Sequence, residues 1–576
     1  MSNWARHPIL CLYRGPETPW CRFFDELLIQ EGYLSFDSFE LDSLVDLEQA
    51  LDGRALLVLG ASELHAREIE LIRKFIRGGG KAILLRPIAQ LVEALDLPVE
   101  EKPGGSYGVG NCYSVAPPGY LELGEHPWAG HHAGVWLQCH AHTSLWKIRG
   151  ASSIAQYGSQ RGAPSTYSAI IEQECGEGHL TIFWFDPGTT LVLMRQGDPR
   201  LASTGHSPDA DADGMHKSPG LFYGHLDYQL RLIPQADILA DLVVGIIRGM
   251  TDSSLPLARL WHLPQNATAL TLVDGDSDGF HWNYYDALVA PLQEAGIPFS
   301  LNLHPDDFSK MDRAASRRIF DAGNDLELHY WVGTQLGTIE DAAKNIPVQH
   351  RVFKEITGGI GSVGSRGHSF VWPGYTEVAE ILSKEGFRLE TSFASFRGYQ
   401  SGYVNGSGRA ARFMTLEGRF LEISQQSTIF MDDIVFSSKS LLPPLTPDAA
   451  YKQLVRFYDD AATRYHGVIT TSLHPGQYTP KSYGDGMTAI RQAILDSTKK
   501  HRLPALTVRA WAGFQEARRL VDLSWNGKAW RVQTKSPIPG LTCHLPSESG
   551  ETQRQGLSWK AVTKDYACGE SSAPFA

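Results

Sequence analysis

The stretch ALTLVDGDSDGF, residues 269–280, decides the fold of this chain and points to its chemistry. Five strand-forming residues lead directly into three carboxylates, Asp274, Asp276 and Asp278. Further strand candidates, PFSLNL, DLELHY, FRLETS and GVITTSLH, follow with helical stretches between them. This alternation over residues 255–515 predicts a (β/α) barrel with eight complete units or fewer. Because such barrels build their active sites at the C-terminal ends of the strands, the carboxylates are catalytic candidates.

A calcium loop and a solvated turn are the alternatives to catalysis for this acidic cluster. The string DxDxDG matches the start of an EF-hand loop, but position twelve of that loop would be Tyr285 instead of glutamate. The same string recurs at Asp209, Asp211 and Asp213, where position twelve is Gly220. Both matches to a calcium loop therefore fail. We favour catalysis for the cluster at 274 and a polar surface loop for the cluster at 209.

Basic side chains stand at comparable positions further along the chain. His329 comes near the end of the strand DLELHY, and His474 ends GVITTSLH. The segment GSVGSRGHSFVWPGY between them carries Arg366 and His368. A lone histidine is more often a satisfied core residue than a ligand, so the position of these residues carries the argument. Polar residues at several strand ends of one barrel predict a shared site.

In this order the segments resemble the motifs of the polysaccharide deacetylases, the NodB-homology or carbohydrate esterase family 4 group. The first motif of that family ends a strand with adjacent aspartates, and its counterpart here is Asp274-Gly275-Asp276. The second motif is H-x-x-x-H. His329 begins it, but Gly333 stands where the second histidine belongs. The resemblance covers less than half of the chain and keeps the order of the motifs, although none of them is intact.

The resemblance implies a role for each matched residue at the metal. Asp274 is the base that accepts a proton from water. Asp276 and His329 bind a divalent ion, and His368 replaces the missing ligand. Zinc is the first choice for this ion, with cobalt, nickel or manganese as alternatives.

The resemblance also implies two roles away from the metal. Arg366 matches the arginine that lines the substrate groove in this family, where it orients the base or holds the polymer. His474 matches the histidine of a strand-end Leu-His pair, which acts as the general acid and protonates the departing amine or alcohol. With the base and the ion, these two residues complete a hydrolytic site.

Aromatic residues are plentiful, with 14 Trp, 21 Tyr and 24 Phe. Most belong to the core, but those beside the motifs suit stacking on the faces of sugar rings. The candidates for such stacking are Tyr330, Trp331 and Trp372, with burial in the core as the alternative for each. Together with these rings, the resemblance implies a carbohydrate or an acylated amino sugar as the substrate.

The resemblance thus implies a metal-dependent hydrolase that removes acyl groups, N-acetyl above all, from an amino-sugar polymer or oligosaccharide. The missing ligand at Gly333 leaves a second interpretation open, a catalytically inactive barrel that binds carbohydrate. A third interpretation is hydrolysis of another linear or cyclic amide, because divergent relatives of this barrel cleave such C–N bonds.

The flanking regions predict two more domains, which makes the fold class α/β multidomain. Over residues 1–250 the strands HPILCLY, RALLVLGAS and KAILLRP alternate with helices, which predicts an open, mainly parallel sheet. LVLG, the helix after it and GGGKAILLRP resemble the class I glutamine-amidotransferase-like fold. No cysteine lies in a G-x-C-x-G elbow, so we interpret this domain as accessory. Residues 521–576 alternate apolar and polar positions between turns, which predicts a small β-sandwich.

Composition narrows the classes of partner. A net charge of -12, from 64 acidic and 52 basic residues, disfavours nucleic acid. No run reaches the roughly 18 apolar residues of a membrane span, and no signal peptide is evident, so we expect a cytoplasmic protein. Seven scattered cysteines give no disulfide framework, with a Cys543–Cys568 pair left open. The histidine-rich stretch 126–142 is a weaker metal candidate.

Overall fold

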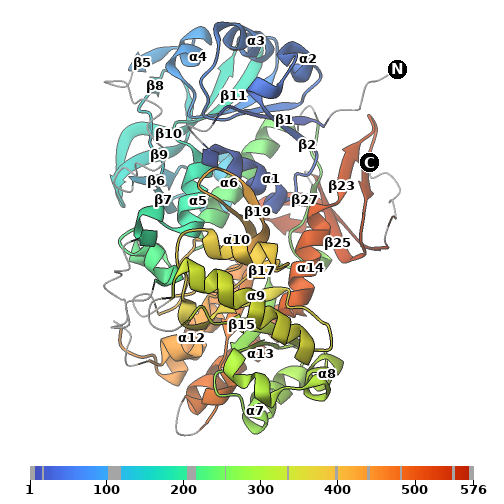
Figure 1. The fold of residues 1–576 in the computed structure, drawn as a ribbon. Coiled ribbons are helices and arrows are strands. Elements are labelled where there is room, and N and C mark those ends of the chain that lie inside the picture. The colour runs from blue at the N-terminus through green and yellow to red at the C-terminus, as the bar shows by residue number, and fades with distance from the viewer. Residues whose placement is uncertain are drawn as a thin grey trace.

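The computed structural model describes residues 7–15, 19–101, 119–203, 216–252, 255–333, 337–395, 400–437, 442–479, 483–547, 552–567 and 569. The chain folds around two large sheets, with a smaller antiparallel sheet beside them (Figure 1). The fold is mixed α/β, as predicted. The second acidic string at 209–213 and Cys568 lie outside the described residues, so neither prediction made for them is tested.

The N-terminal sheet has nine strands in the order β2-β1-β3-β4-β11-β10-β9-β6-β7. Its first five strands are parallel, and every pairing from β11 onward is antiparallel. The strands are β1 (Ile9–Tyr13), β2 (Phe36–Glu40), β3 (Leu56–Leu59), β4 (Lys81–Leu85), β6 (Gly119–Leu123), β7 (Trp136–Cys139), β9 (Ser152–Gln160), β10 (Ala163–Cys175) and β11 (Gly178–Phe183). The prediction of a mainly parallel sheet is therefore wrong for its second half. Two-residue turns join β9 to β10 and β10 to β11, and connections this short force antiparallel pairing.

Helices alternate with the parallel strands of this region, as predicted, and two more follow β11. They are α1 (Phe23–Glu31), α2 (Leu47–Leu51), α3 (Ala66–Arg77), α4 (Ala89–Ala94), α5 (Pro187–Gln196) and α6 (Gln235–Thr251). A short antiparallel pair, β5 (Val99–Glu101) and β8 (Lys147–Ile148), lies apart from the main sheet. In Figure 1, α5 and α6 lie below the sheet, on the side that faces the rest of the molecule. The likeness to an amidotransferase-like fold stays a prediction.

The second large sheet is curled and carries the decisive stretch on its strand β13. Its order is β18-β19-β17-β16-β15-β14-β13-β21-β20, with β22 paired to β13. Its strands are β13 (Leu270–Asp276), β14 (Ser300–Leu303), β15 (Asp325–Tyr330), β16 (Gly364–Gly367), β17 (Leu389–Glu390), β18 (Ala411–Met414), β19 (Phe420–Gln425), β20 (Phe430–Met431), β21 (Val468–Ser472) and β22 (Ala505–Leu506). All pairings except β18 with β19 are parallel.

A single stretch of chain links the two ends of this curled sheet. β19 pairs with β17 at one end, and β20, which follows directly, pairs with β21 at the other. Between them, Thr428 forms a parallel bridge with Ala394. Helices pack around the outside (Figure 1): α7 (Trp282–Glu294), α8 (Arg313–Asp321), α9 (Ile339–Ile356), α10 (Glu377–Lys384), α11 (Asp432–Val435), α12 (Pro447–Asp460), α13 (Gly484–His501) and α14 (Val508–Arg519). All five strands predicted from 269 to 474 are present.

The C-terminal residues form a four-stranded antiparallel sheet, β12-β25-β27-β26, and a separate ribbon. The sheet consists of β12 (Arg259–Leu260), β25 (Ile538–Pro546), β26 (Thr552–Arg554) and β27 (Leu557–Tyr566). The ribbon pairs β23 (Asp522–Trp525) with β24 (Trp530–Gln533). Because β12 precedes the curled sheet in the chain, the C-terminal sheet includes residues from outside 521–576. The three domain boundaries remain predictions.

A buried charge network joins these parts. Arg409, in the segment before β18, contacts Glu31 of α1 at 2.9 Å and Asp241 of α6 at 2.7 Å. Arg259 of β12 contacts the other oxygen of Glu31 at 3.3 Å. All four side chains are almost completely shielded from solvent. Since an unpaired buried charge is very costly, the pairs hold these elements together only while each charge keeps its partner.

Among the described residues, no helix has the length and apolar character needed to cross a membrane. The most apolar of the long helices, α6, is 17 residues long and buried along nearly its whole length. Its apolar side chains therefore belong to the interior of the protein.

Candidate active site

Five neighbouring strands of the curled sheet end at one edge, and each ends in polar residues. β13 carries Asp274 and Asp276, β14 is followed by His304, β15 carries His329, and β21 is followed by His474. The strand β16 between them supplies Arg366 and leads into His368. Parallel strands point the same way, so these side chains meet although up to 200 residues separate them.

Asp274 lies deepest in this cluster and is fully buried. Nη2 of Arg366 donates a hydrogen bond of 2.5 Å to its Oδ2 and a second one of 3.0 Å to Thr428. Burial raises the pKa of Asp274 to about 6, although the adjacent Arg366 lowers it. The two buried side chains form an ion pair, in which the charge of Arg366 offsets that of Asp274 inside the sheet.

Asp276 occupies the next position on the same face of β13. Its Oδ1 accepts a 2.9 Å hydrogen bond from Asn302 and lies 3.4 Å from Nε of Arg366. Its Oδ2 lies 3.8 Å from Nε2 of His329 and 3.6 Å from Nε2 of His474. Burial alone would raise the pKa of Asp276, but the facing His329 and Arg366 outweigh burial and lower it. Asp276 is therefore a carboxylate between two imidazoles.

His329, His368 and Asp278 form a tight triangle of donor atoms. Nε2 of His329 lies 3.2 Å from Nδ1 of His368, and both lie near Oδ1 of Asp278, at 3.6 Å and 3.5 Å. Nδ1 of His329 donates to the carbonyl oxygen of Arg366 at 3.2 Å, which leaves the lone pair of Nε2 directed at the triangle. The side chains of Asp278 and His368 are 30% and 33% exposed, so solvent reaches the cluster from this side.

His304 adds a third imidazole to this cluster. Its ring centre lies 4.6 Å from that of His368 and 5.5 Å from that of His329. Asp278, His304 and His368 each offer one ligand atom within 4.8 Å of the others. Nδ1 of His304 accepts a hydrogen bond of 3.3 Å from the backbone N–H of Asp306, and its Nε2 is buried without a partner among the described residues.

His474 is held by a carboxylate that the sequence prediction missed. Its Nδ1 donates to Oδ1 of Asp432 at 2.6 Å, and its backbone N–H donates to Oδ2 of the same residue at 2.7 Å. Burial would lower the pKa of His474, but Asp432 and Asp433 raise it well above the usual value. His474 is therefore held as an imidazolium whose Nε2 faces Asp276.

The structure brings together all six polar residues predicted for the site, and it buries two of the three aromatic ones. Tyr330 and Trp372 are 0% and 1% exposed, and Trp372 packs on the rings of Phe393 and Phe413. Neither can stack on a sugar as predicted, because each ring is enclosed by the core. Trp331 is partly exposed, with its ring centre 6.5 Å from that of His304, and stays a candidate.

Sequence reasoning missed Asn302, His304 and Asp432. The signal for the first two was available, because SLNLH places both at the end of a recognised strand, as DLELH does for His329. Asp432 follows β20, which is only two residues long, and the apolar run before it is too short to be recognised as a strand from the sequence. Strand-end position would have identified the first two residues but not the third.

The histidine-rich stretch 126–142 does not converge. His126 contacts Glu172 at 2.8 Å, and His132 contacts Asp241 at 3.0 Å. His140 stacks on His225 with ring centres 3.9 Å apart. Within the described residues, the groups that could hold a metal ion lie only at the strand-end cluster and include none of this stretch.

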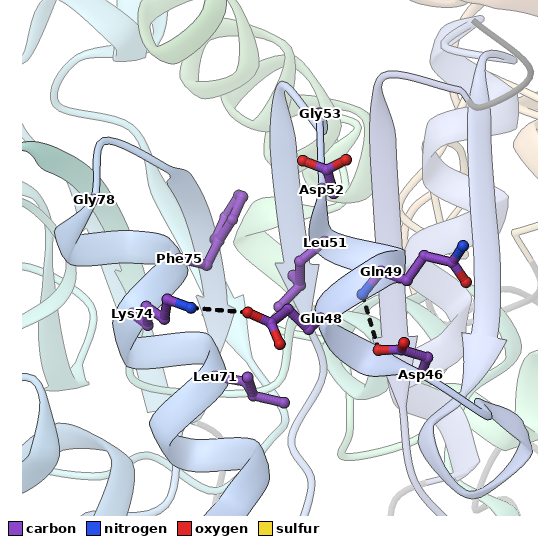
Figure 2. Close-up of a pocket in the computed structure, with 10 residues that line it drawn as sticks. All are labelled: Asp46, Glu48, Gln49, Leu51, Asp52, Gly53, Leu71, Lys74, Phe75 and Gly78. Atoms are coloured by element: carbon purple, nitrogen blue, oxygen red, sulfur yellow. Dashed lines mark hydrogen bonds and ion pairs between the residues drawn. The ribbon is translucent and has the colours of Figure 1, made fainter. Parts of the chain in front are cut away.

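A separate cavity of about 600 Å³ lies between α2 and α3 of the N-terminal part (Figure 2). Lys74 of α3 contacts Glu48 of α2 at 2.8 Å across it, and both side chains are largely exposed. Apolar side chains of Leu51, Leu71 and Phe75 form part of its wall. None of the strand-end residues lines this cavity, so it does not belong to the candidate active site.

No known family model matches the sequence, and no curated protein matches it. Among solved structures, the carbohydrate deacetylase Agd3 is 11% identical with a TM-score of 0.38, over 99% of both chains. The family 4 carbohydrate esterase from Streptomyces lividans is 13% identical with a TM-score of 0.26, over 42% of this chain and 93% of that one. The polysaccharide deacetylase Bc1974 from Bacillus cereus is 14% identical with a TM-score of 0.26, over 42% and 90%. Since these TM-scores are below 0.5, the function has to rest on the site itself.

Proposed function

We propose that this chain is a metal-dependent hydrolase that removes acyl groups, N-acetyl first, from an amino-sugar polymer or oligosaccharide. One observation carries the proposal. A triangle of ligand atoms, a second carboxylate and a buried histidine–aspartate pair meet at the carboxyl edge of the curled sheet. Hydrolysis of an amide needs these three elements: an electrophilic centre, a base and an acid.

The residues present fit a divalent ion. A tetrahedral zinc site with bonds of about 2.0–2.1 Å places neighbouring ligand atoms about 3.3 Å apart. The three contacts among His329, His368 and Asp278 measure 3.2, 3.5 and 3.6 Å. His329 and His368, with a carboxylate of the Asp276–Asp278 segment, would hold zinc, cobalt, nickel or manganese. An ion bound there would act as a Lewis acid that polarises the acyl oxygen and acidifies water.

The remaining residues would move the protons. A carboxylate of β13 accepts a proton from water as the new C–O bond forms. His474, charged and held through Nδ1 by Asp432, donates the proton on Nε2 to the leaving nitrogen as the C–N bond breaks. The products are a carboxylic acid and an amine. Arg366 balances the buried negative charge and keeps the aspartates in place.

The carbohydrate part of the proposal rests on two features. The motif order resembles that of polysaccharide deacetylases, and Trp331 lies partly exposed beside the histidines, where an aromatic ring suits a sugar face. The acidic net charge of -12 agrees with a neutral or cationic polymer and disfavours an anionic one.

The test measures the metal content of the purified protein together with acetate release from chitooligosaccharides, for wild type and His329→Ala. One ion per chain, lost in the variant along with acetate release, is the expected result. His501→Ala serves as the matched control. His501 is the last residue of α13 and contacts Asp459 of α12, away from the site. Metal without acetate release would redirect the search to other amides. A wild type that takes up neither Zn²⁺ nor Co²⁺ would favour the inactive, carbohydrate-binding barrel instead.

A further inference from the structure

We infer that the roles of base and of carboxylate ligand each fall on the next aspartate along the chain, compared with the family pattern. Asp278 is the carboxylate ligand of the ion, Asp276 is the base, and Asp274 is a positioning residue that holds Arg366. The inference rests on the proposed function and concerns which side chain performs each step.

The ligand assignment follows from the distances to the histidines. Oδ1 of Asp278 lies within 3.6 Å of a ring nitrogen on both His329 and His368. Atoms that bind the same metal ion have to lie about this close to one another. Asp276 lies 3.8 Å from His329, and its Oδ1 is already engaged by Asn302 and Arg366. Asp278 is also partly exposed, so an ion can enter from solvent beside it.

Depth in the sheet separates the other two aspartates. Asp274 and Asp276 share one face of β13 two residues apart, which puts Asp274 about 7 Å further from the strand end. Asp274 is fully buried and bonded to Arg366 at 2.5 Å, so water at the strand end does not reach it. Its contact with Arg366 fixes the guanidinium, whose Nε in turn lies 3.4 Å from Asp276.

Asp276 has the position of a base. Its Oδ2 lies 3.8 Å from Nε2 of His329, a member of the ligand triangle, and 3.6 Å from Nε2 of His474. A proton taken from water by this oxygen therefore arrives next to the histidine that protonates the leaving group. Arg366 and Asn302 hold Oδ1, which leaves Oδ2 to accept the proton.

His304 lies close enough to be a ligand, but its hydrogen bonds assign it another role. Its Nδ1 accepts the backbone N–H of Asp306, so the neutral ring carries its proton on Nε2, and an N–H cannot bind a metal. That N–H is buried and has no acceptor among the described residues. His304 is therefore a hydrogen-bond donor beside the ion, available to an oxygen of the substrate.

Three matched variants test the assignment: Asp274→Asn, Asp276→Asn and Asp278→Asn. Zinc binding is measured by calorimetry and the cobalt-substituted proteins by visible absorption, alongside acetate release. Asp278→Asn should weaken zinc binding by about 100-fold or more and change the cobalt spectrum. Asp276→Asn should bind zinc within about tenfold of wild type and lose acetate release by about 100-fold or more. Asp274→Asn should keep the ion and the cobalt spectrum but lower the melting temperature.

A conservative variant guards against loss of folding. Asp278→Glu retains a carboxylate and should recover part of the zinc affinity, which a merely unfolded site would not do. The inference is overturned if Asp276→Asn loses the ion while Asp278→Asn retains it, which would restore the family pattern. A wild-type protein that binds no ion overturns the proposed function as well, so the two failures are distinguishable.

Discussion

The substitution Asp432→Asn tests whether the acid His474 depends on its buried partner. Asp432 is fully buried and accepts two hydrogen bonds from His474, of 2.6 Å from the ring and 2.7 Å from the backbone. Asparagine keeps the shape and one acceptor but removes the charge. A buried hydrogen bond to a charged group contributes about 1.5–3 kcal/mol, so we expect kcat to fall by about 10- to 150-fold.

The same variant has a predicted signature in its pH profile. Asp432 raises the pKa of His474 well above its usual value, and only the protonated ring can donate. Without the carboxylate the imidazolium loses its proton at lower pH, so the alkaline decline of kcat begins at lower pH than in wild type. Rates of acetate release across the pH range, at saturating substrate, measure both effects.

The matched control is Asp433→Asn, which changes a neighbouring carboxylate that accepts no hydrogen bond from His474 within the described part of the chain. We expect a smaller loss of kcat and a smaller move of the alkaline limb. If Asp432→Asn folds normally and keeps both kcat within about threefold and the alkaline limb of wild type, His474 is not the acid that this pair prepares.

Three further outcomes follow from the geometry. Arg409→Met should lower the free energy of unfolding by about 3–5 kcal/mol in a urea titration, because it removes the buried cation that Glu31 and Asp241 share; the exposed Lys452→Met is the control and should change little. Trp331→Ala should raise KM for an oligosaccharide and leave kcat unchanged, whereas Trp372→Ala should cost about 3–5 kcal/mol of stability. Dialysis against a chelator should abolish acetate release, and added Zn²⁺ or Co²⁺ should restore it. Unchanged values in any of these assays would contradict the assigned role.

The predicted residues that the structure brings together share one property. His329 and His474 each stand at or next to the end of an apolar run, and such runs become buried parallel strands whose ends meet at one edge. Position along the chain therefore predicts position in space for these residues. The same rule applied to SLNLH would have added His304.

The two buried aromatic rings differ in how far their burial could be predicted from the sequence. Tyr330 follows His329 directly, and successive side chains of a strand point to opposite faces, so His329 reaches the site while Tyr330 enters the core. Trp372 is enclosed by Phe393 and Phe413, residues that become its neighbours only in the folded chain. The antiparallel half of the N-terminal sheet was missed because its strands β9 and β10 lack the continuous apolar run that marks the parallel strands. Few of their residues are buried in succession.

The spacing of the aspartates has a physical cause in Gly275. A Cβ atom at this position would lie 1.7 Å from the carbonyl oxygen of Leu473 and 2.6 Å from the ring of Phe299. No side chain fits at position 275, so an aspartate cannot directly follow Asp274. The next position of this strand that can carry a carboxylate is 276. The strand thus carries its acids on one face at successive heights. The position of each acid along the strand then decides whether it pairs with arginine inside the sheet or lies beside the histidines at the sheet edge.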